Sequence, residues 1–274
     1  MSKILININN LDEIEKYKKV GITNFLFAVK NYSIGYPSFE LNDIPEDAYL
    51  YMNRVLDTKD IDELKENKNS FLRFKGIIFE DIGVLNIFKD TGISLIWNQA
   101  HFAVNYRSIN FYLENGCTSA IISNEITSEE IDEIIKNAKR MLILEVFGKN
   151  NVMYSRRRLL TNFNKYNNLD DYNDMVLNEK ITNNKFLARE SEYGTYLFNN
   201  EYFNYISLMK KYENDCLFFL VMNLDLSVDE IVEVLNGKES GDDGFLNRKT
   251  VFKLEDYKWW KKLSYLHQQE ILKR

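Results

Sequence analysis

The chain has 274 residues and a mass of 32.5 kDa, with 45% hydrophobic and 28% charged residues, enough for the core of one or two globular domains. Only 2 prolines and 11 glycines are present, which excludes collagen-like repeats and Pro/Gly-rich linkers. No apolar run approaches the ~18 residues of a membrane helix, and the first residues lack the apolar core of a signal peptide. We therefore expect a soluble, cytoplasmic protein without membrane contact.

The charge balance and the few cysteines restrict partners and cofactors. A net charge of −6 disfavours broad RNA binding, which needs a basic face, although a local basic groove stays open. Cys117 and Cys216 are too few for a four-thiolate cluster, and His101 and His267 are too few for a site with several imidazole ligands. We expect no resident cofactor or metal, with a divalent cation at clustered carboxylates as the alternative. The oligomeric state is not indicated.

Seven short apolar runs recur at intervals of 18 to 27 residues and predict β-strands. They are nearly continuous rather than alternating, which is typical of strands buried on both faces. The runs begin near Ile4, Asn24, Ala48, Lys75, Ile93, Ser119 and Met141.

Helical patterns fill most of the gaps between these runs. Apolar residues share one helical face over 11–20 and again over 106–113. Thr58 is predicted to cap a third helix. The clearest helix starts are capping boxes at Thr127–Glu130 and Ser227–Glu230, in which the hydroxyl and the carboxylate satisfy free backbone donors.

The alternation of strands and helices predicts parallel strands joined by crossover helices. A (β/α)8 TIM-like barrel typically needs about 250 residues, so the length fits one barrel domain over 1–274, irregular or incomplete in its last units. An open doubly wound sheet is the alternative. The rhythm breaks over about 148–192 and resumes at Gly194–Phe198 and Leu217–Val221. We expect the irregular stretch to be a long functional segment over the rim of the barrel.

Polar residues follow several predicted strands, where a barrel builds its active site. Glu80, Glu125 and Glu145 end three different strands, and clustering of carboxylates raises the pKa of one so that it can act as an acid. His101 lies just after Asn98, and imidazole transfers protons near neutral pH. We predict Glu125, Glu145 and His101 as acid–base residues, with Glu80 and Asn98 contacting substrate. The alternative is that strand ends are polar because they meet water and that His101 only orients a loop.

One dense basic cluster, Tyr154-Ser155-Arg156-Arg157-Arg158, lies near the same rim. A guanidinium can hold a carboxylate or phosphate in two parallel hydrogen bonds. We predict that Tyr154, Ser155, Arg156 and Arg157 bind a peptide-like or small anionic substrate, and that Arg156 or Arg157 faces the rim glutamates. The alternative is a solvated face. The chain has no Walker loop, Gly-x-Gly-x-x-Gly, His-Glu-x-x-His or Gly-x-Ser-x-Gly sequence, so generic motifs name no reaction.

Several of these residues lie in stretches that resemble the peptidase U32 (collagenase-like) family, in the short, cysteine-poor form of low-GC Gram-positive bacteria. The combination of Phe-Gly…Met-Tyr-Ser-Arg-Arg with Trp-Asn-Gln-x-His is the specific part of the pattern. The resemblance implies a barrel of the (β/α)8 type and a hydrolase, nominally a peptidase. The matching stretches are 76–87, 95–106, 123–131, 145–162, 192–198 and 244–253.

The chain departs from the larger members of that family in one respect. They carry a His-Gly-x-x-Cys…Tyr-Ser-x-Arg-Cys pattern whose cysteines help to hold an iron–sulfur cluster in members that modify RNA or ubiquinone. Here Arg157 matches the arginine of the motif, while Arg158 takes the place of the second cysteine. The resemblance thus implies a protein without the cluster. Three functions follow: a hydrolase, an iron–sulfur-free RNA-modification accessory, or a ligand-binding barrel without catalysis.

Overall fold

A computed structural model describes residues 2–248 apart from 100, 171, 182 and 239. Eight parallel strands form a closed barrel, because the last of them pairs with both the first and the seventh. This closure confirms the (β/α)8-type barrel and excludes the open sheet. The barrel strands are β1 (Ile4–Asn7), β2 (Asn24–Val29), β4 (Tyr49–Met52), β5 (Gly76–Phe79), β6 (Ser94–Trp97), β7 (Ser119–Ile122), β8 (Leu142–Ser155) and β12 (Cys216–Val221).

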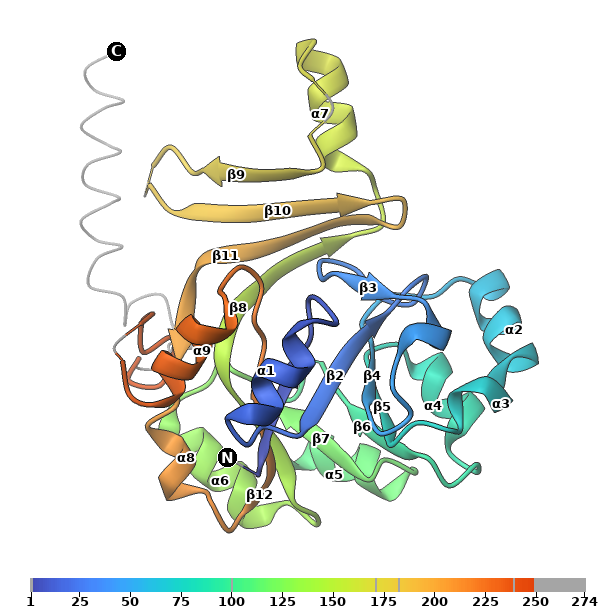
Figure 1. The fold of residues 1–274 in the computed structure, drawn as a ribbon, viewed down its shortest axis with the longest axis vertical. Coiled ribbons are helices and arrows are strands. Elements are labelled where there is room, and N and C mark those ends of the chain that lie inside the picture. The colour runs from blue at the N-terminus through green and yellow to red at the C-terminus, as the bar shows by residue number, and fades with distance from the viewer. Residues whose placement is uncertain (1, 100, 171, 182, 239, 249–274) are drawn as a thin grey trace.

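Short helices cover the outside of the barrel between its strands (Figure 1). The predicted capping boxes at Thr127 and Ser227 are confirmed. Thr58 is not a cap: the capping box lies one residue earlier, where Asp57 and Asp60 each accept from the other's backbone N–H. None of the described helices has the length and hydrophobicity to cross a bilayer. The helices are α1 (Glu13–Lys19), α2 (Thr58–Glu66), α3 (Lys68–Phe71), α4 (Ile82–Phe88), α5 (Tyr106–Glu114), α6 (Ser128–Asn137), α8 (Leu208–Lys211) and α9 (Val228–Leu235), with a 3-10 turn η1 (Leu41–Asp43).

Two apolar clusters explain why the strand sequences are continuously hydrophobic. Alternate residues of each strand point into the barrel, and the residues between them pack against the helices. In β1, for example, Leu5 belongs to the interior cluster, whereas Ile4 and Ile6 belong to the cluster under the helices. The interior cluster consists of Leu5, Leu26, Ala28, Tyr51, Ile78, Ile96, Ile121, Ile143, Leu220 and Met222.

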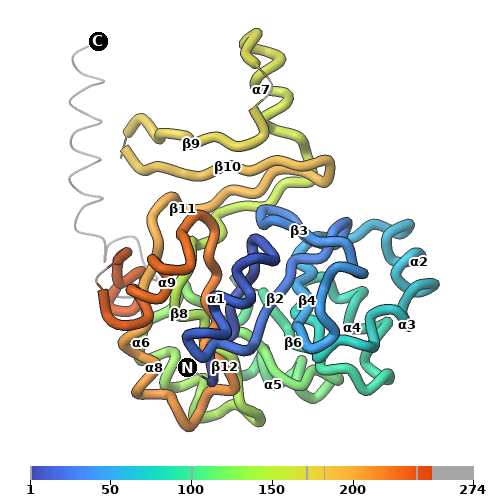
Figure 2. The backbone as a smooth tube through the Cα atoms, in the orientation of Figure 1, coloured from blue at the N-terminus to red at the C-terminus, as the bar shows by residue number. Residues whose placement is uncertain are grey.

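The segment after the seventh strand forms an antiparallel sheet that rises from one end of the barrel (Figures 1 and 2). Strand β8 continues past the barrel and pairs with β11 (Gly194–Asn204), followed by β10 (Lys185–Ser191) and β9 (Asp174–Asn178). Helix α7 (Leu159–Asn167) stands at the top. We call β8 beyond Phe147, α7, β9, β10 and β11 the extension. Most of the described residues of the stretch 148–192, which was predicted to be an irregular rim segment, therefore belong to strands and to a helix.

The extension also corrects the predicted role of Gly194–Phe198. This stretch belongs to β11, which pairs antiparallel with β8, and is not a strand of the barrel. The eighth barrel strand is β12, which contains Leu217–Val221. A run of hydrophobic residues indicates a strand but does not specify its neighbour, so the sequence could not distinguish a barrel strand from a strand of the extension.

Candidate functional site

The carboxyl ends of the barrel strands surround a cavity of about 260 Å³, which we call the mouth. Glu80 and Asn98 follow β5 and β6, Asn124 lies just after β7, and Glu145 is part of β8. Successive parallel strands deliver their carboxyl ends to the same face, so residues far apart in sequence meet here. Four tyrosines complete much of the wall: Tyr36, Tyr51, Tyr154 and Tyr196.

Glu80 lies in the mouth with few hydrogen-bond donors. Its Oε1 accepts from Tyr51 Oη at 3.4 Å and from Asn98 Nδ2 at 3.2 Å. Burial raises the pKa of Glu80 to about 8; the Tyr51 bond opposes this rise, and the charge of Glu145 adds to it. The carboxyl group is consequently mostly protonated at pH 7.

Glu145 has the same character. Burial raises its pKa to about 8, opposed by one hydrogen bond that Asn124 Nδ2 donates to Oε2 at 3.2 Å. Gly148 makes room for the carboxyl group, because a Cβ at this position would lie 2.5 Å from Glu145 Oε1. The Phe-Gly of the sequence pattern thus has a steric reason.

His101 and Glu125 form a pair at the edge of the mouth. The distance from His101 Nδ1 to Glu125 Oε2 is 2.9 Å, and both side chains are partly exposed. His101 lines the mouth with Glu80 and Glu145, whereas Glu125 lines a neighbouring groove. The structure therefore brings two of the three predicted acid–base residues, His101 and Glu145, into the mouth. The third, Glu125, contacts the His101 imidazole from outside this cavity.

The arginine cluster lies beyond the mouth. Tyr154 is the last motif residue that lines the cavity, and its hydroxyl donates to the carbonyl of Tyr193 at 3.2 Å. Exposed Arg156 contacts Asp57 Oδ2 at 3.4 Å, not Glu125 or Glu145 as we expected. The reason is that β8 has left the barrel by this point and ends at Ser155. Ser155, Arg156 and Arg157 are absent from the wall of the mouth.

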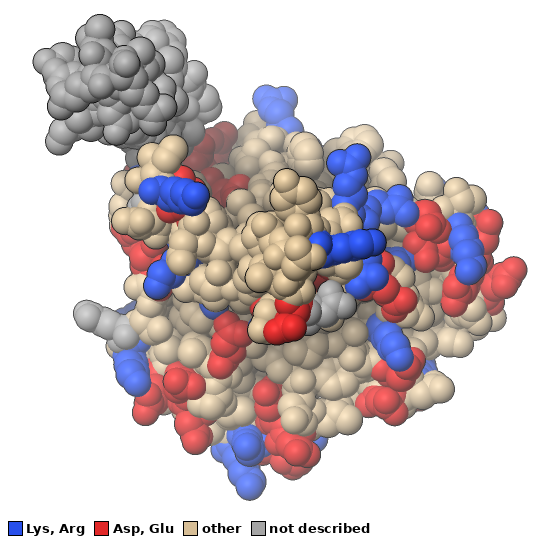
Figure 3. Space-filling view, turned by 90° about the horizontal axis from the view of Figure 1, so that it is seen from above, with Lys and Arg blue, Asp and Glu red and all other residues tan. Residues whose placement is uncertain are grey.

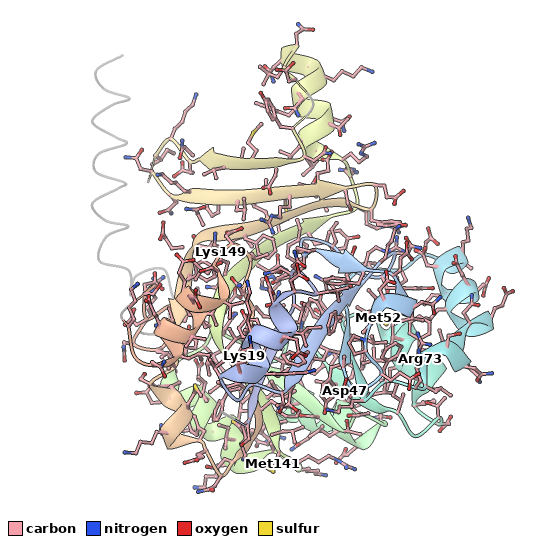
Figure 4. The ribbon with its side chains drawn as sticks, viewed as in Figure 1. Lys19, Asp47, Met52, Arg73, Met141 and Lys149 are labelled. Carbon is pink, nitrogen blue, oxygen red and sulfur yellow. The ribbon has the colours of Figure 1, made fainter. Side chains whose placement is uncertain are left out.

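Several residues of the mouth were missed by sequence reasoning. Lys149, near the point where β8 leaves the barrel (Figure 4), is only 7% exposed. Its Nζ donates to Asp225 Oδ2 at 2.7 Å and lies 4.8 Å from the centroid of the Tyr202 ring. Tyr36, Tyr51 and Tyr196 look like ordinary core residues in the sequence. Burial raises their pKa values well above 10, so their hydroxyl groups remain protonated donors.

The cysteines do not fit an iron–sulfur cluster at the mouth. Cys117 precedes β7 and Cys216 begins β12, so both lie at the amino ends of the strands, opposite the mouth. Both thiols are buried, and burial raises their pKa values to about 12, which disfavours the thiolate form that metals bind. Among the described residues no group of three His, Cys, Asp or Glu side chains is arranged to hold a metal ion.

Comparison with known proteins shows a match to a protein family. The model of peptidase family U32 matches residues 40–214. A curated relative, the tRNA hydroxylation protein P2 of Bacillus subtilis (strain 168), is 23% identical over 220 residues, and the match covers 72% of this chain and 71% of the relative.

Solved structures are similar at lower levels. The U32 peptidase Mk0906 has a TM-score of 0.46 and 11% identity, covering 55% of this chain and 70% of that one. A chitinase from Chromobacterium violaceum ATCC 12472 has a TM-score of 0.36 and 9% identity, covering 87% of this chain and 100% of that one.

Proposed function

Because the chain belongs to peptidase family U32, which matches most of its length, we propose that its mouth binds a nucleobase and that the protein takes part in tRNA modification. The observation that carries this proposal is a pocket with aromatic walls whose two carboxyl groups both have pKa values near 8. The curated relative, whose name assigns it to tRNA hydroxylation, supports the same class of substrate.

A pocket of this composition suits a flat, uncharged ring with polar edges. A protonated carboxylic acid offers one O–H donor and an acceptor oxygen, and each amide of Asn98 and Asn124 has two N–H donors and an acceptor oxygen. These groups match the edges of an unpaired base, and tyrosine rings match its faces. Enzymes that act on bases bind them extruded from the helix in pockets of this kind.

The surface charge favours recognition of the RNA by the mouth rather than by a basic face of the protein. Figure 3 shows Lys and Arg interspersed with Asp and Glu on the side viewed from above, which agrees with the net charge of −6. Affinity that came mainly from phosphates would need a gathered positive patch. We therefore assign specificity to the mouth, with Lys149 as its buried cation.

Hydrolysis is the second candidate, and the pair of glutamates favours it. Two carboxyl groups that titrate near neutral pH in one cavity can act as general acid and general base. Glu145 and the His101–Glu125 pair would then transfer protons, and Glu80, Asn98 and Tyr154 would orient a peptide-like substrate. The exposed cluster of Ser155, Arg156 and Arg157 would hold an anionic end of that substrate.

One pair of variants separates the two functions. Glu80→Gln and Glu145→Gln keep an uncharged hydrogen-bonding group of the same shape but cannot transfer a proton. For base binding we expect each variant to retain the affinity for free nucleosides at pH 7 within about threefold, measured by calorimetry. For hydrolysis we expect both to lose cleavage of casein or gelatin. If neither nucleosides nor total tRNA bind, and if cleavage depends on these glutamates, the proposal of base binding is replaced by the proposal of hydrolysis.

A further inference from the structure

One face of the extension is an apolar sheet surface that is turned away from the mouth. Side chains alternate between the two faces of a strand, and paired residues of neighbouring strands share a face. Tyr154 and Tyr196 pair with each other and line the mouth, so the next pair, Met153 and Leu197, lies on the opposite face, which we call the outer face. Its apolar residues are Val152, Met153, Met175, Leu177, Phe186, Ala188 and Leu197.

The described residues cover only part of the outer face. Helix α7 lies over one end of it, where the first backbone N–H groups of the helix donate to Glu190. Val152 and Met153 are 43% and 39% exposed. The other large apolar side chains of the face are half-buried, and within the described part of the chain none of them packs against a buried apolar cluster. Apolar surfaces of this kind mark contacts with another segment or molecule.

The last described residues lie beside this uncovered surface. A groove of about 590 Å³ lies between the extension and the segment 242–248. Val152 and Phe186 of the outer face line it on one side, and Phe245 and Arg248 line it on the other. The chain therefore continues into residues 249–274 from a point next to the outer face.

The sequence of 249–274 has a composition that suits such a surface. Two of the three tryptophans of the chain, Trp259 and Trp260, belong to it, together with Phe252, Leu263 and Leu266. It contains 7 Lys and Arg against 3 Asp and Glu, a charge of +4, so residues 1–248 carry −10 of a chain whose net charge is −6. Its 26 residues span about 39 Å even at the rise of a helix, more than the roughly 15 Å between the outer strands of a four-stranded sheet.

We propose that the outer face is the docking surface for the chain's own segment 249–274. The aromatic and aliphatic side chains of the segment cover Val152, Met153 and the half-buried residues beside them, which removes apolar surface from water. The opposite net charges of the two parts favour this contact, and the covalent link at 248 gives the segment a high effective concentration at the face. The inference does not depend on which ligand enters the mouth.

Photo-crosslinking of the full chain tests where the segment lies. A photoreactive phenylalanine analogue replaces Met153 on the outer face or, as the matched control, Val176, which is 50% exposed and pairs with Leu187 on the other face of the sheet. We expect the analogue at position 153, but not at 176, to crosslink within one chain to peptides of 249–274, identified by mass spectrometry. Crosslinks that join two chains would assign the face to a second copy, and crosslinks only to added single-stranded RNA would assign it to a nucleic acid. Either result, or no crosslink to 249–274, would overturn the inference.

A second measurement uses substitutions that leave the sheet intact. Val152→Thr combined with Met153→Gln keeps the approximate size of two exposed side chains but makes this part of the outer face polar. Trypsin cleavage at the lysines of 258–262 follows the population in which the segment is undocked, so we expect cleavage about tenfold faster than in the wild type. Val176→Thr should leave the rate unchanged. Equal rates in the wild type and both variants, with melting temperatures that show all three to be folded, would overturn the inference.

Discussion

Three glutamates, half-buried Glu80 and Glu145 in the barrel mouth and buried Glu190 in the extension, have pKa values shifted in opposite directions. Glu190 of β10 accepts from the backbone N–H of Leu160 at 2.7 Å and of Thr161 at 3.0 Å, and from the Thr195 hydroxyl at 2.7 Å. Burial raises its pKa, but these bonds outweigh burial and hold the pKa below 4.5. Glu80 and Glu145 have fewer and longer bonds, and their pKa values rise to about 8.

The number of donors therefore separates a structural carboxylate from one available to a ligand. Glu190 satisfies the first backbone N–H groups of α7 and so joins the helix to the sheet. The mouth glutamates retain most of their capacity to form hydrogen bonds. Polar groups with few hydrogen bonds in a cavity are typical of binding and catalytic sites, so the contrast agrees with the proposed function, in which the barrel mouth binds the ligand and Glu190 supports the extension.

The largest effect is expected for Glu190→Ala. Its removal leaves several buried donors of α7 and β11 without an acceptor, so we expect the free energy of unfolding to fall by about 3 kcal/mol. Because the pKa of Glu190 is lowered by folding, its stabilising contribution is present above pH 4.5 and is lost as the pH falls through the folded-state value. Urea denaturation at pH 7 measures the change, with Glu192→Ala, an exposed neighbour, as control. If Glu190→Ala lowers the free energy of unfolding no more than Glu192→Ala does, Glu190 has no structural role.

Glu145→Gln is expected to act in the opposite sense. The folded-state pKa of about 8 exceeds the ordinary value of 4.5, so the folded chain binds more protons and wild-type stability falls as the pH rises from 4.5 to 8. Glutamine does not ionise, so we expect the variant to be similar to the wild type near pH 4.5 and more stable than it above pH 8, by more than the ~1.4 kcal/mol that corresponds to one pKa unit. Urea melts across this pH range, beside exposed Glu66→Gln, make the measurement. Parallel pH profiles of wild type and variant would refute a raised pKa.

The sequence predicted the barrel well because its strands are short apolar runs buried on both faces. Glu80, Asn98, His101 and Glu145 were placed at the mouth because polar residues stand out after such runs. Tyr51 was missed because a tyrosine within a strand resembles core.

The remaining features of the site depend on contacts between residues far apart in the sequence. Lys149 and Asp225 are 76 residues apart, and no local pattern indicates their ion pair. The direction of β8 beyond the barrel likewise depends on its pairing with β11. Because of that direction, Arg156 contacts Asp57 and not the predicted partners Glu125 or Glu145.

The smallest effect on the free energy of unfolding is expected in the arginine cluster, which lies in the extension outside the mouth. Arg158 lies 3.7 Å from Glu190, and Arg157 is exposed with its backbone N–H on Ser155 Oγ. Both arginine side chains are exposed and lysine keeps the positive charge, so Arg157→Lys and Arg158→Lys should each change the free energy of unfolding by less than about 0.5 kcal/mol. Lysine keeps the charge but loses the planar fork, so a two-point contact with a phosphate or carboxylate would weaken only in the variant that makes it. We expect a larger loss of tRNA affinity for Arg157→Lys than for Arg158→Lys, because Arg157 matches the family motif and Arg158 is turned toward Glu190. Equal and negligible losses would mean that the cluster is a solvated face and that the extension contributes no ligand contact through it.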